Sequence, residues 1–379
     1  MISIKLTREQ LNQTMDEVLK KIDGNIEVFR DVFPEPASMN QVYKSQKNDR
    51  GWTQSFWTGM VWLAYEVTGD KKYLELGKHH SQSFAERIHK KLGTDTHDLG
   101  FLYTLSAVAD YKITGDEVAK QIALDAADEL MSRYKEKGDF IQAWGSIHDP
   151  ANYRLIIDCY MNLPLLFWAS QVTGDDKYAT TAAKHAHTAR KVTIREDHST
   201  YHTYFFNPET GAPLRGETAQ GYGDDSCWSR GQAWAIYGQA LCYKYTKDPV
   251  FMDEFYKVTD YFIEHLPEDQ VAYWDLYFTQ GEEERDSSAA VIAVCGILEM
   301  VKHIEDANVK KDYLSKANEI MVSLVKDYTT FDSQRANGLL FHGVYSKPDN
   351  GGVDEMMLWG DYFFMEAMTR LHGDWEIYW

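Results

Sequence analysis

The chain alternates two kinds of helix-length segment, and this alternation constrains its fold more than any other feature. Six segments are almost entirely apolar or aromatic, and each is preceded by a segment that is amphipathic and rich in charge. A helix that is apolar on every side belongs inside a protein, whereas a helix with one apolar face belongs at its surface. The pattern therefore predicts an inner ring of helices wrapped by an outer ring.

The predicted helices divide equally between the two rings. The apolar, inner segments are roughly 55–68, 100–113, 155–172, 230–246, 286–304 and 359–371. The amphipathic, outer segments are roughly 8–30, 71–91, 116–136, 176–193, 250–265 and 310–328. We therefore expect an all-α fold, an (α/α)6 barrel or six-hairpin toroid, formed by one domain that spans residues 1–379.

The connections between the segments support a closed ring. Inner segments end in tight turns such as Thr68-Gly69-Asp70 and Thr173-Gly174-Asp175, where Gly suits a helix end and Asp a helix start. The segments that lead into the inner helices are long, so in a closed ring they gather on one rim. An open solenoid would need polar terminal repeats, but the last segment, Trp359–Met365, is apolar.

Charge and cysteine content exclude several partners. The formal net charge is −19, which argues against nucleic acid and anionic membranes as partners. The four cysteines are far apart, no signal peptide is evident, and no apolar run is long enough to span a membrane, so we expect a cytoplasmic protein. No metal-binding or phosphate-binding motif occurs, and His79, His80, His185 and His187 lie on amphipathic segments that predict solvent exposure. We predict neither a metal nor a cofactor.

Polar and aromatic residues concentrate where the inner segments begin, and these starts should share one rim. The set is Trp52, Trp57, His97, Asp98, Trp144, Arg154, Asp158, His202, Gln220, Trp228, Arg230, Gln232, Trp234, Trp274, Asp286, His342, Trp359 and Asp361. The exposed N–H groups of helix N-termini favour anions, so an acidic ligand is expected at this rim.

Asp158 and Asp98 are the leading candidates for acid–base chemistry. Asp158 precedes an almost purely apolar run, so it either faces a cavity as a catalytic group or caps a neighbouring backbone. Asp98 opens the preceding inner helix, and it either pairs with Asp158 or simply caps that helix. Neighbouring helices lie roughly 8–10 Å apart, a separation that suits two carboxylates in glycosidic chemistry.

Two further candidates, His202 and Arg230, each have both a ligand-binding and a structural interpretation. His202 either contacts a ligand or serves as a structural hydrogen-bonding group, as isolated histidines usually do. Arg230 either binds a substrate carboxylate through both ends of its guanidinium or pairs with one of the many acids of the chain.

Several strings occur in one order along nearly the whole chain: Trp52–Gly59, His97–Tyr103, Gln142–Gly145, Ile156–Cys159, Tyr201–Thr203, Trp228–Trp234, Arg285–Ala289 and Trp359–Tyr362. Together they resemble glycoside hydrolase family 88, the unsaturated glucuronyl hydrolases, a type that includes the unsaturated chondroitin disaccharide hydrolases. The resemblance implies an (α/α)6 barrel. It also implies an enzyme that hydrates the C4=C5 double bond of an unsaturated glucuronyl residue released by a polysaccharide lyase, and so frees that residue from a disaccharide.

The resemblance also implies the roles of individual residues. Asp158 matches the acid/base and Asp98 the second essential aspartate. The positions that match substrate-contacting residues, or that the rim and the resemblance together single out, are Trp52, His97, Trp144, His202, Gln220, Trp228, Arg230, Trp234 and Ser346. The expected partner is a small anionic unsaturated disaccharide or oligosaccharide of the glycosaminoglycan type, bound by a monomer or homodimer.

The chain departs from the streptococcal relatives in a loop that, in those enzymes, recognises the sulfate group of the substrate. Ser346 is kept, but Gly351 stands where Lys is expected and Asp349 adds negative charge, so no sulfate preference is implied. Three alternatives stay open: a sister hydrolase that acts on unsaturated rhamnogalacturonyl fragments of pectin, a sugar epimerase on the same barrel, and a noncatalytic oligosaccharide-binding protein.

Overall fold

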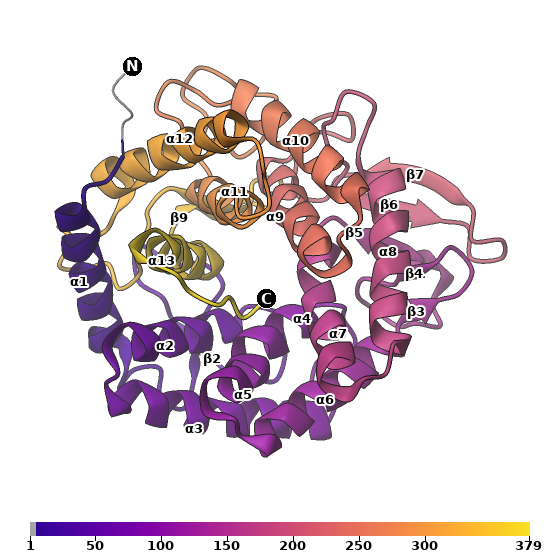
Figure 1. The fold of residues 1–379 in the computed structure, drawn as a ribbon, viewed down its shortest axis with the longest axis horizontal. Coiled ribbons are helices and arrows are strands. Elements are labelled where there is room, and N and C mark those ends of the chain that lie inside the picture. Colours follow the sequence, from indigo (N-terminus) through magenta and orange to yellow (C-terminus); the bar gives the residue numbers. More distant parts are fainter. Residues whose placement is uncertain (1–4) are drawn as a thin grey trace.

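The computed structural model describes residues 5–379, and its inner helices close into a ring (Figure 1). Each inner helix packs against the next, and the last, α13, returns to the first, α2. The inner helices are α2 (Gln54–Thr68), α4 (Leu99–Tyr103) continued by a π-helical turn (Thr104–Val108) and α5 (Ala109–Thr114), α7 (Cys159–Thr173), α9 (Ser229–Thr246), α11 (Ser287–Met300) and α13 (Leu358–His372). The closed ring agrees with the predicted (α/α)6 barrel.

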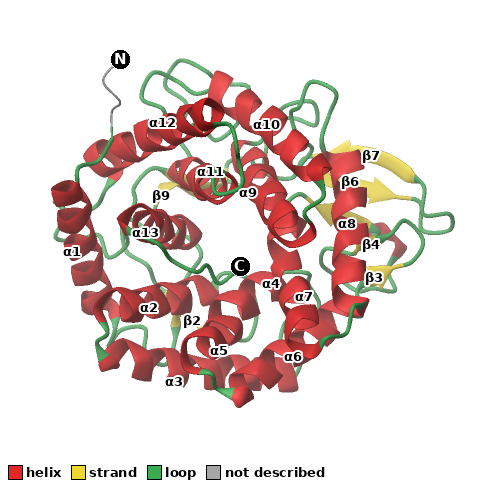
Figure 2. Ribbon diagram, in the orientation of Figure 1, coloured by secondary structure: helices red, strands yellow, loops and turns green. Residues whose placement is uncertain are grey.

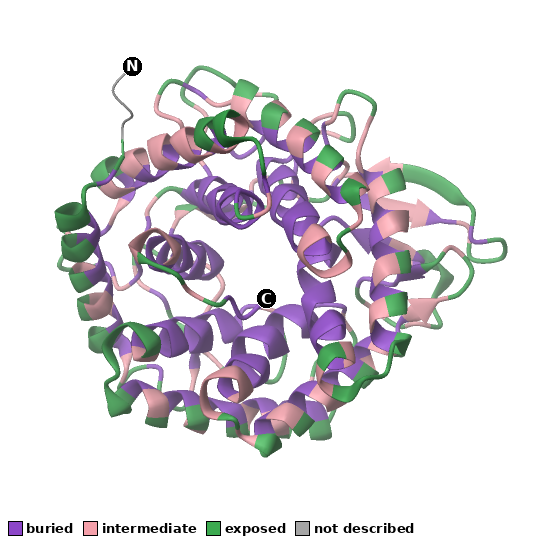
Figure 3. Ribbon diagram, viewed as in Figure 1, coloured by how far each residue is buried: buried purple, intermediate pink, exposed green. Residues whose placement is uncertain are grey.

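A second ring of helices surrounds the first, and burial separates the two (Figure 3). The outer helices are α1 (Arg8–Asn25), α3 (Lys71–His89), α6 (Glu117–Met131), α8 (Lys177–Thr193), α10 (Pro249–Glu264) and α12 (Ala307–Ser323), the last continued by a π-helical turn (Leu324–Tyr328). In α6, the buried positions Ala119, Ile122, Ala123, Ala126, Ala127 and Leu130 follow the helical period. Within residues 5–379, no helix is sufficiently long and apolar to cross a membrane.

The tight turns at the ends of inner helices fold as their residues predict. Gly69, Gly115 and Gly174 adopt φ of 69°, 71° and 72°, the left-handed conformation that a helix end often requires and that glycine adopts without strain. The side chains of Asp70 and Asp116 accept hydrogen bonds from the first turns of α3 and α6. These local signals fix where each hairpin reverses.

The predicted start of the third inner helix is wrong. Helix α7 begins at Cys159 rather than near 155, because residues Arg154–Ile156 form strand β5. Strand β5 pairs with β6 (Thr203–Phe206), so that Arg154 lies opposite Phe205, and β6 pairs in turn with β7 (Pro213–Glu217). A long-range pairing therefore overrides the local apolar pattern.

Short antiparallel strands lie beside the helical ring (Figure 2). Besides β5–β6–β7, the pairs are β1 (Phe33–Pro34) with β2 (Ser45–Gln46), β3 (Tyr134–Lys135) with β4 (Phe140–Ile141), and β8 (Gly343–Ser346) with β9 (Gly351–Glu355). They stiffen the long segments that lead into the inner helices.

The prediction that His80 and His185 face solvent is wrong, because both side chains are buried. His80 Nδ1 lies 3.2 Å from the Thr58 hydroxyl and Nε2 lies 3.2 Å from the carbonyl of Phe29. A neutral ring fits these contacts, with Nδ1 accepting and Nε2 donating. Burial lowers the pKa of His80 to about 4.

His80 should therefore make the stability of the protein acid-sensitive. The unfolded chain takes up a proton below about pH 6.5, whereas the folded protein resists it down to about pH 4. The contribution is fully present above about pH 6.5, and on the order of 3 kcal/mol is lost as the pH falls to about 4. In urea unfolding, the cost of His80→Gln should shrink by that amount over this range. A cost independent of pH would contradict this; His148→Gln, at an exposed histidine, is the control.

Candidate active site

A cavity of about 330 Å³ opens at the rim where the inner helices begin. It brings together all but one of the residues predicted for the site. Its walls are formed by Trp52, His97, Asp98, Trp144, Arg154, Ile156, Asp158, His202, Thr203, Ala219, Gln220, Trp228, Arg230, Trp234 and Tyr345. Because these residues come from the loops before four inner helices, from helix α9 and from two small sheets, closure of the ring is what assembles the site.

The two aspartates face each other across one imidazole. His97 Nε2 lies 3.3 Å from Asp158 Oδ1 and 3.5 Å from Asp98 Oδ1. One oxygen of each carboxylate and a ring nitrogen of His97 all lie within 4.8 Å of one another. The carboxylates are thus much closer than the 8–10 Å expected from helix packing, because both side chains point toward the shared cavity.

Neither aspartate caps its helix through its side chain, although each occupies the N-cap position. Asp98 Oδ2 instead accepts a hydrogen bond of 2.6 Å from the Thr96 hydroxyl. Asp158 Oδ1 and both ring nitrogens of His97 are buried without a hydrogen-bond partner in residues 5–379. Since buried polar atoms normally have partners, these atoms are ones that a bound ligand or water would satisfy.

The charges in this group influence one another strongly. Burial raises the pKa of Asp98 above its usual range, and the nearby Asp158 carboxylate raises it further, in opposition to His97. Burial alone would lower the pKa of His97, but Asp98 and Asp158 outweigh that effect and raise it. The two carboxylates therefore favour the protonated form of His97, and burial favours the protonated form of Asp98.

His202 is held in one orientation beside the carboxylates. Its Nδ1 accepts hydrogen bonds from the backbone N–H groups of Ala219 (2.9 Å) and Gln220 (3.3 Å), so the neutral ring carries its proton on Nε2. Burial lowers the pKa of His202 to about 4, which keeps the ring neutral at physiological pH. The ring centroid lies 4.3 Å from that of Trp228.

Arg230 pairs with an acid of the protein, as one of its two predicted roles required. Its Nη1 lies 2.6 Å from Asp286 Oδ2, and both side chains are buried. The same guanidinium donates to the carbonyls of Val344 and Tyr345 and, at 2.7 Å, to Gln220 Oε1. Arg230 therefore fixes the β8 strand and the Gln220 amide at the cavity wall.

Aromatic rings form most of the remaining wall. Trp52 stacks on Trp359 with a centroid distance of 5.0 Å, and its Nε1 donates to the Tyr345 hydroxyl at 3.2 Å. Trp144 stands at the mouth of the cavity with 44% of its surface exposed. Tyr345 was missed in the sequence, where it adjoins the predicted Ser346 without any sign that it, rather than Ser346, faces the cavity.

Ser346 lies outside the cavity lining. Its hydroxyl donates a 2.7 Å hydrogen bond to Asp349, and the neighbouring Lys347 pairs with Glu284. The loop thus satisfies its own polar groups, in part because Asp349 offers an acceptor within three residues of Ser346.

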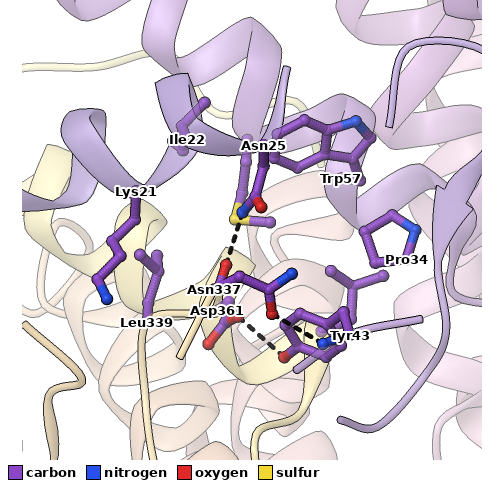
Figure 4. A pocket seen from close by; sticks show the side chains of 12 residues that line it. Lys21, Ile22, Asn25, Pro34, Tyr43, Trp57, Asn337, Leu339 and Asp361 are labelled. Atoms are coloured by element: carbon purple, nitrogen blue, oxygen red, sulfur yellow. Dashed lines mark hydrogen bonds between the residues drawn. The ribbon is translucent and has the colours of Figure 1, made fainter. Parts of the chain in front are cut away.

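The structure does not bring every residue of the predicted rim set to this cavity. Trp57, Gln232, Trp274, Asp286, His342, Trp359 and Asp361 are absent from its lining. Trp57 and Asp361 instead line a second cavity of about 10 Å³ between α1 and the inner ring (Figure 4). There Asp361 accepts hydrogen bonds from Tyr43 Oη (2.9 Å) and from the Leu340 N–H (3.0 Å), and burial raises the pKa of Asp361 to about 7. The Asp361 carboxyl group therefore links the side chain of Tyr43, between strands β1 and β2, to the loop backbone at Leu340.

A metal ion was not predicted, yet His97, Asp98 and Asp158 are the kind of group that can hold one. A nitrogen and two carboxylate oxygens within 4.8 Å match the donor types of zinc and similar ions. Catalytic carboxylates produce the same arrangement, so the prediction that the protein needs no metal stays a prediction.

Comparison with known proteins shows which family shares this fold and the sequence strings that form the cavity. An "Unsaturated chondroitin disaccharide hydrolase" of Streptococcus pneumoniae is 46% identical over 99% of this chain and 95% of its own length. The crystal structure of an unsaturated glucuronyl hydrolase from Streptococcus agalactiae, 46% identical, matches with a TM-score of 0.96 over 99% of this chain and 95% of that one. An Asp-to-Asn variant of that enzyme complexed with dGlcA-GalNAc6S, 42% identical, matches with a TM-score of 0.89 over 100% and 95%.

These matches extend well beyond the cavity. The family profile described as Glycosyl Hydrolase Family 88 matches residues 25–370, which include every residue of the cavity lining. The predicted (α/α)6 barrel and the predicted glycoside hydrolase activity are confirmed. The chain belongs to glycosyl hydrolase family 88.

Proposed function

We propose that this hydrolase releases unsaturated glucuronic acid from the non-reducing end of disaccharides that lyases produce from glycosaminoglycans. The observation that carries the proposal is the pair of carboxylates, Asp98 almost buried and Asp158 partly buried, that face each other in an aromatic cavity. Support for the substrate class comes from the Streptococcus agalactiae relative that forms a complex with dGlcA-GalNAc6S. The unit that performs the reaction is one domain over residues 1–379, acting as a monomer or homodimer.

In the proposed reaction Asp158 acts as acid and base. Its carboxyl group gives a proton to C4 of the unsaturated ring while a water molecule adds at C5 and returns its proton to the site. The resulting hemiketal opens, and the bond to the second sugar breaks with that sugar as leaving group. Asp98, held by Thr96, orients hydroxyls of the reacting ring.

The surrounding residues position the sugar and exclude water. Protonated His97, between the carboxylates, offsets negative charge as the proton moves. His202 presents its Nε2–H, while Gln220, fixed by Arg230, offers an amide to ring oxygens. The rings of Trp52, Trp228 and Trp234 give the apolar faces on which a sugar packs.

All four cysteines are free and buried. Free thiols support the proposal that the enzyme acts in a reducing compartment such as the cytoplasm. Within residues 5–379 they leave no disulfide to be maintained.

The test is a direct ultraviolet assay. Hydration destroys the conjugated double bond, so the absorbance of unsaturated glucuronyl disaccharides should fall to baseline when the protein is added. The second sugar should be released in an amount equal to the double bond lost, as measured by chromatography. Turnover of unsaturated galacturonyl-rhamnose but not of glucuronyl disaccharides would contradict the proposed substrate, and turnover of neither would contradict the proposed reaction.

A further inference from the structure

Arg154 is the least accounted-for charged group in the cavity. Its side chain makes no ion pair and no hydrogen bond within residues 5–379, and its buried Nε has no partner. The chain carries 58 acidic and 39 basic residues outside histidine, so an arginine without an acidic partner is unexpected. The acid whose charge acts on Arg154 is Glu217, but the carboxylate of Glu217 forms an ion pair with Arg215. Arg154 therefore retains donors for a bound group.

The guanidinium is nevertheless held in place by aromatic rings. It lies 3.7 Å from the centroid of the Trp144 ring and 5.3 Å from that of Phe205, which is its partner across strands β5 and β6. Stacking fixes the plane of the guanidinium and leaves its edge, with the N–H groups, available. Since little conformational freedom remains to be lost on binding, the donors are preorganised for a planar or tetrahedral anion.

The position of Arg154 relative to Asp158 indicates which part of a substrate it meets. Arg154 and Ile156, alternate residues of strand β5, line the cavity, and Asp158 lines it from the turn that leads into α7. Arg154 stacks on Trp144 at the exposed mouth, whereas the carboxylates lie inside. With the reacting ring at Asp158, Arg154 lies on the side of the second sugar.

Other cations near the cavity are already committed. Arg230 donates to Asp286, Gln220 and two carbonyl groups, and Lys347 in the neighbouring loop pairs with Glu284. Ser346, in the same loop, donates to Asp349. An anionic substituent that enters the mouth of the cavity therefore meets Arg154 as the available cation.

We infer that Arg154, stacked on Trp144, binds a sulfate ester on the second sugar and so determines specificity for sulfated disaccharides. The inference rests on the proposed function and adds the charge of the second sugar to it. It places sulfate recognition on strand β5, across the site from the loop that contains Ser346 and Gly351.

The test compares one ratio in several variants. kcat/KM is measured by ultraviolet assay on unsaturated glucuronyl-N-acetylgalactosamine that is unsulfated, 4-sulfated or 6-sulfated. Arg154→Gln should lower the sulfated-to-unsulfated ratio about tenfold for at least one position of the sulfate, because a charge-assisted hydrogen bond is lost. Arg154→Lys, which keeps the charge but loses the planar fork, should lower it less. Arg215→Gln is the matched control, since Arg215 also stacks on Phe205, at 4.7 Å, but lies outside the cavity lining.

The outcomes separate this inference from the proposed function. Turnover of the unsulfated disaccharide by the unmodified protein tests the reaction itself, whereas the ratio tests Arg154. An equal loss on all three substrates, or an unchanged ratio, would overturn the role of Arg154 while leaving the reaction intact. If Arg154→Gln does not fold, as judged by thermal melting, the ratio in Arg154→Lys decides, because loss of the fork should still reduce it.

Discussion

Asp158→Asn should lower kcat/KM on unsaturated glucuronyl disaccharides by about a thousandfold, the range expected when a general acid is removed. Asparagine has nearly the same shape as aspartate but cannot give a proton to C4. The buried Oδ1 of Asp158 has no hydrogen-bond partner in residues 5–379 and lies 3.3 Å from His97 Nε2, a contact that the amide oxygen of asparagine can keep. The fold and the affinity for substrate should therefore survive while turnover is lost.

Two further measurements make this prediction specific. Calorimetric titration of the Asp158→Asn variant with the disaccharide should still show binding, which places the defect in the chemical step. The control is Asp176→Asn, because Asp176 is also an N-cap aspartate without a side-chain cap hydrogen bond but is exposed at the start of α8. Full activity of Asp158→Asn would mean that another group supplies the proton.

Arg230→Met should destabilise the protein by about 3–5 kcal/mol, the usual cost of leaving one partner of a buried ion pair alone. Asp286 is completely buried, and Arg230 Nη1 lies 2.6 Å from its carboxylate. The variant also leaves the carbonyls of Val344 and Tyr345 without their donor. Urea unfolding followed by circular dichroism measures the change, and activity should fall with it because Gln220 loses its anchor.

A double variant tests whether the uncompensated charge is the cause. Arg230→Met with Asp286→Asn removes both charges, so it should be more stable than Arg230→Met alone. Asp286→Asn by itself provides the fourth corner of the cycle. If the double variant is as unstable as the sum of the single changes, the pair is not coupled and the lost backbone hydrogen bonds explain the whole effect.

Sequence patterns were sufficient to predict the two rings because the distribution of apolar residues around a helix determines which of its faces can be buried. The all-round apolar run that became α9 and the periodic alanines of α6 each identify their layer without knowledge of any neighbour. The left-handed glycines, such as Gly69, likewise act within a few residues of themselves. Closure follows, since apolar helices at both ends of the chain need partners.

The features that sequence could not predict all depend on contacts between distant segments. Strand β5 exists because residues near 205 pair with it, so the apolar run at 155–158 does not become helical. Arg230 meets Asp286 across 56 residues, and His80 is buried by the loop that contains Phe29. The closeness of Asp98 and Asp158 is of the same kind, since it depends on where two loops meet above the ring.

The candidate residues were found for a different reason. Rim position and the family resemblance together selected Asp98, Asp158 and four tryptophans, and the structure gathers them in one cavity: Trp52, Trp144, Trp228 and Trp234. Neither source identified Tyr345, because a tyrosine in a loop carries no pattern of its own. Ser346 was selected by resemblance, but its hydroxyl donates a hydrogen bond to Asp349 of the same loop.

If the paired carboxylates hydrate the unsaturated ring, a proton that comes from solvent is added at C4. The reaction should be run in deuterium oxide with the unsulfated unsaturated disaccharide and followed by NMR. One deuterium is expected at C4 for each second sugar released, with loss of the double bond at the same rate. Release of the second sugar with the C4=C5 bond intact and no deuterium at C4 would contradict hydration, because the enzyme would then act directly at the anomeric carbon.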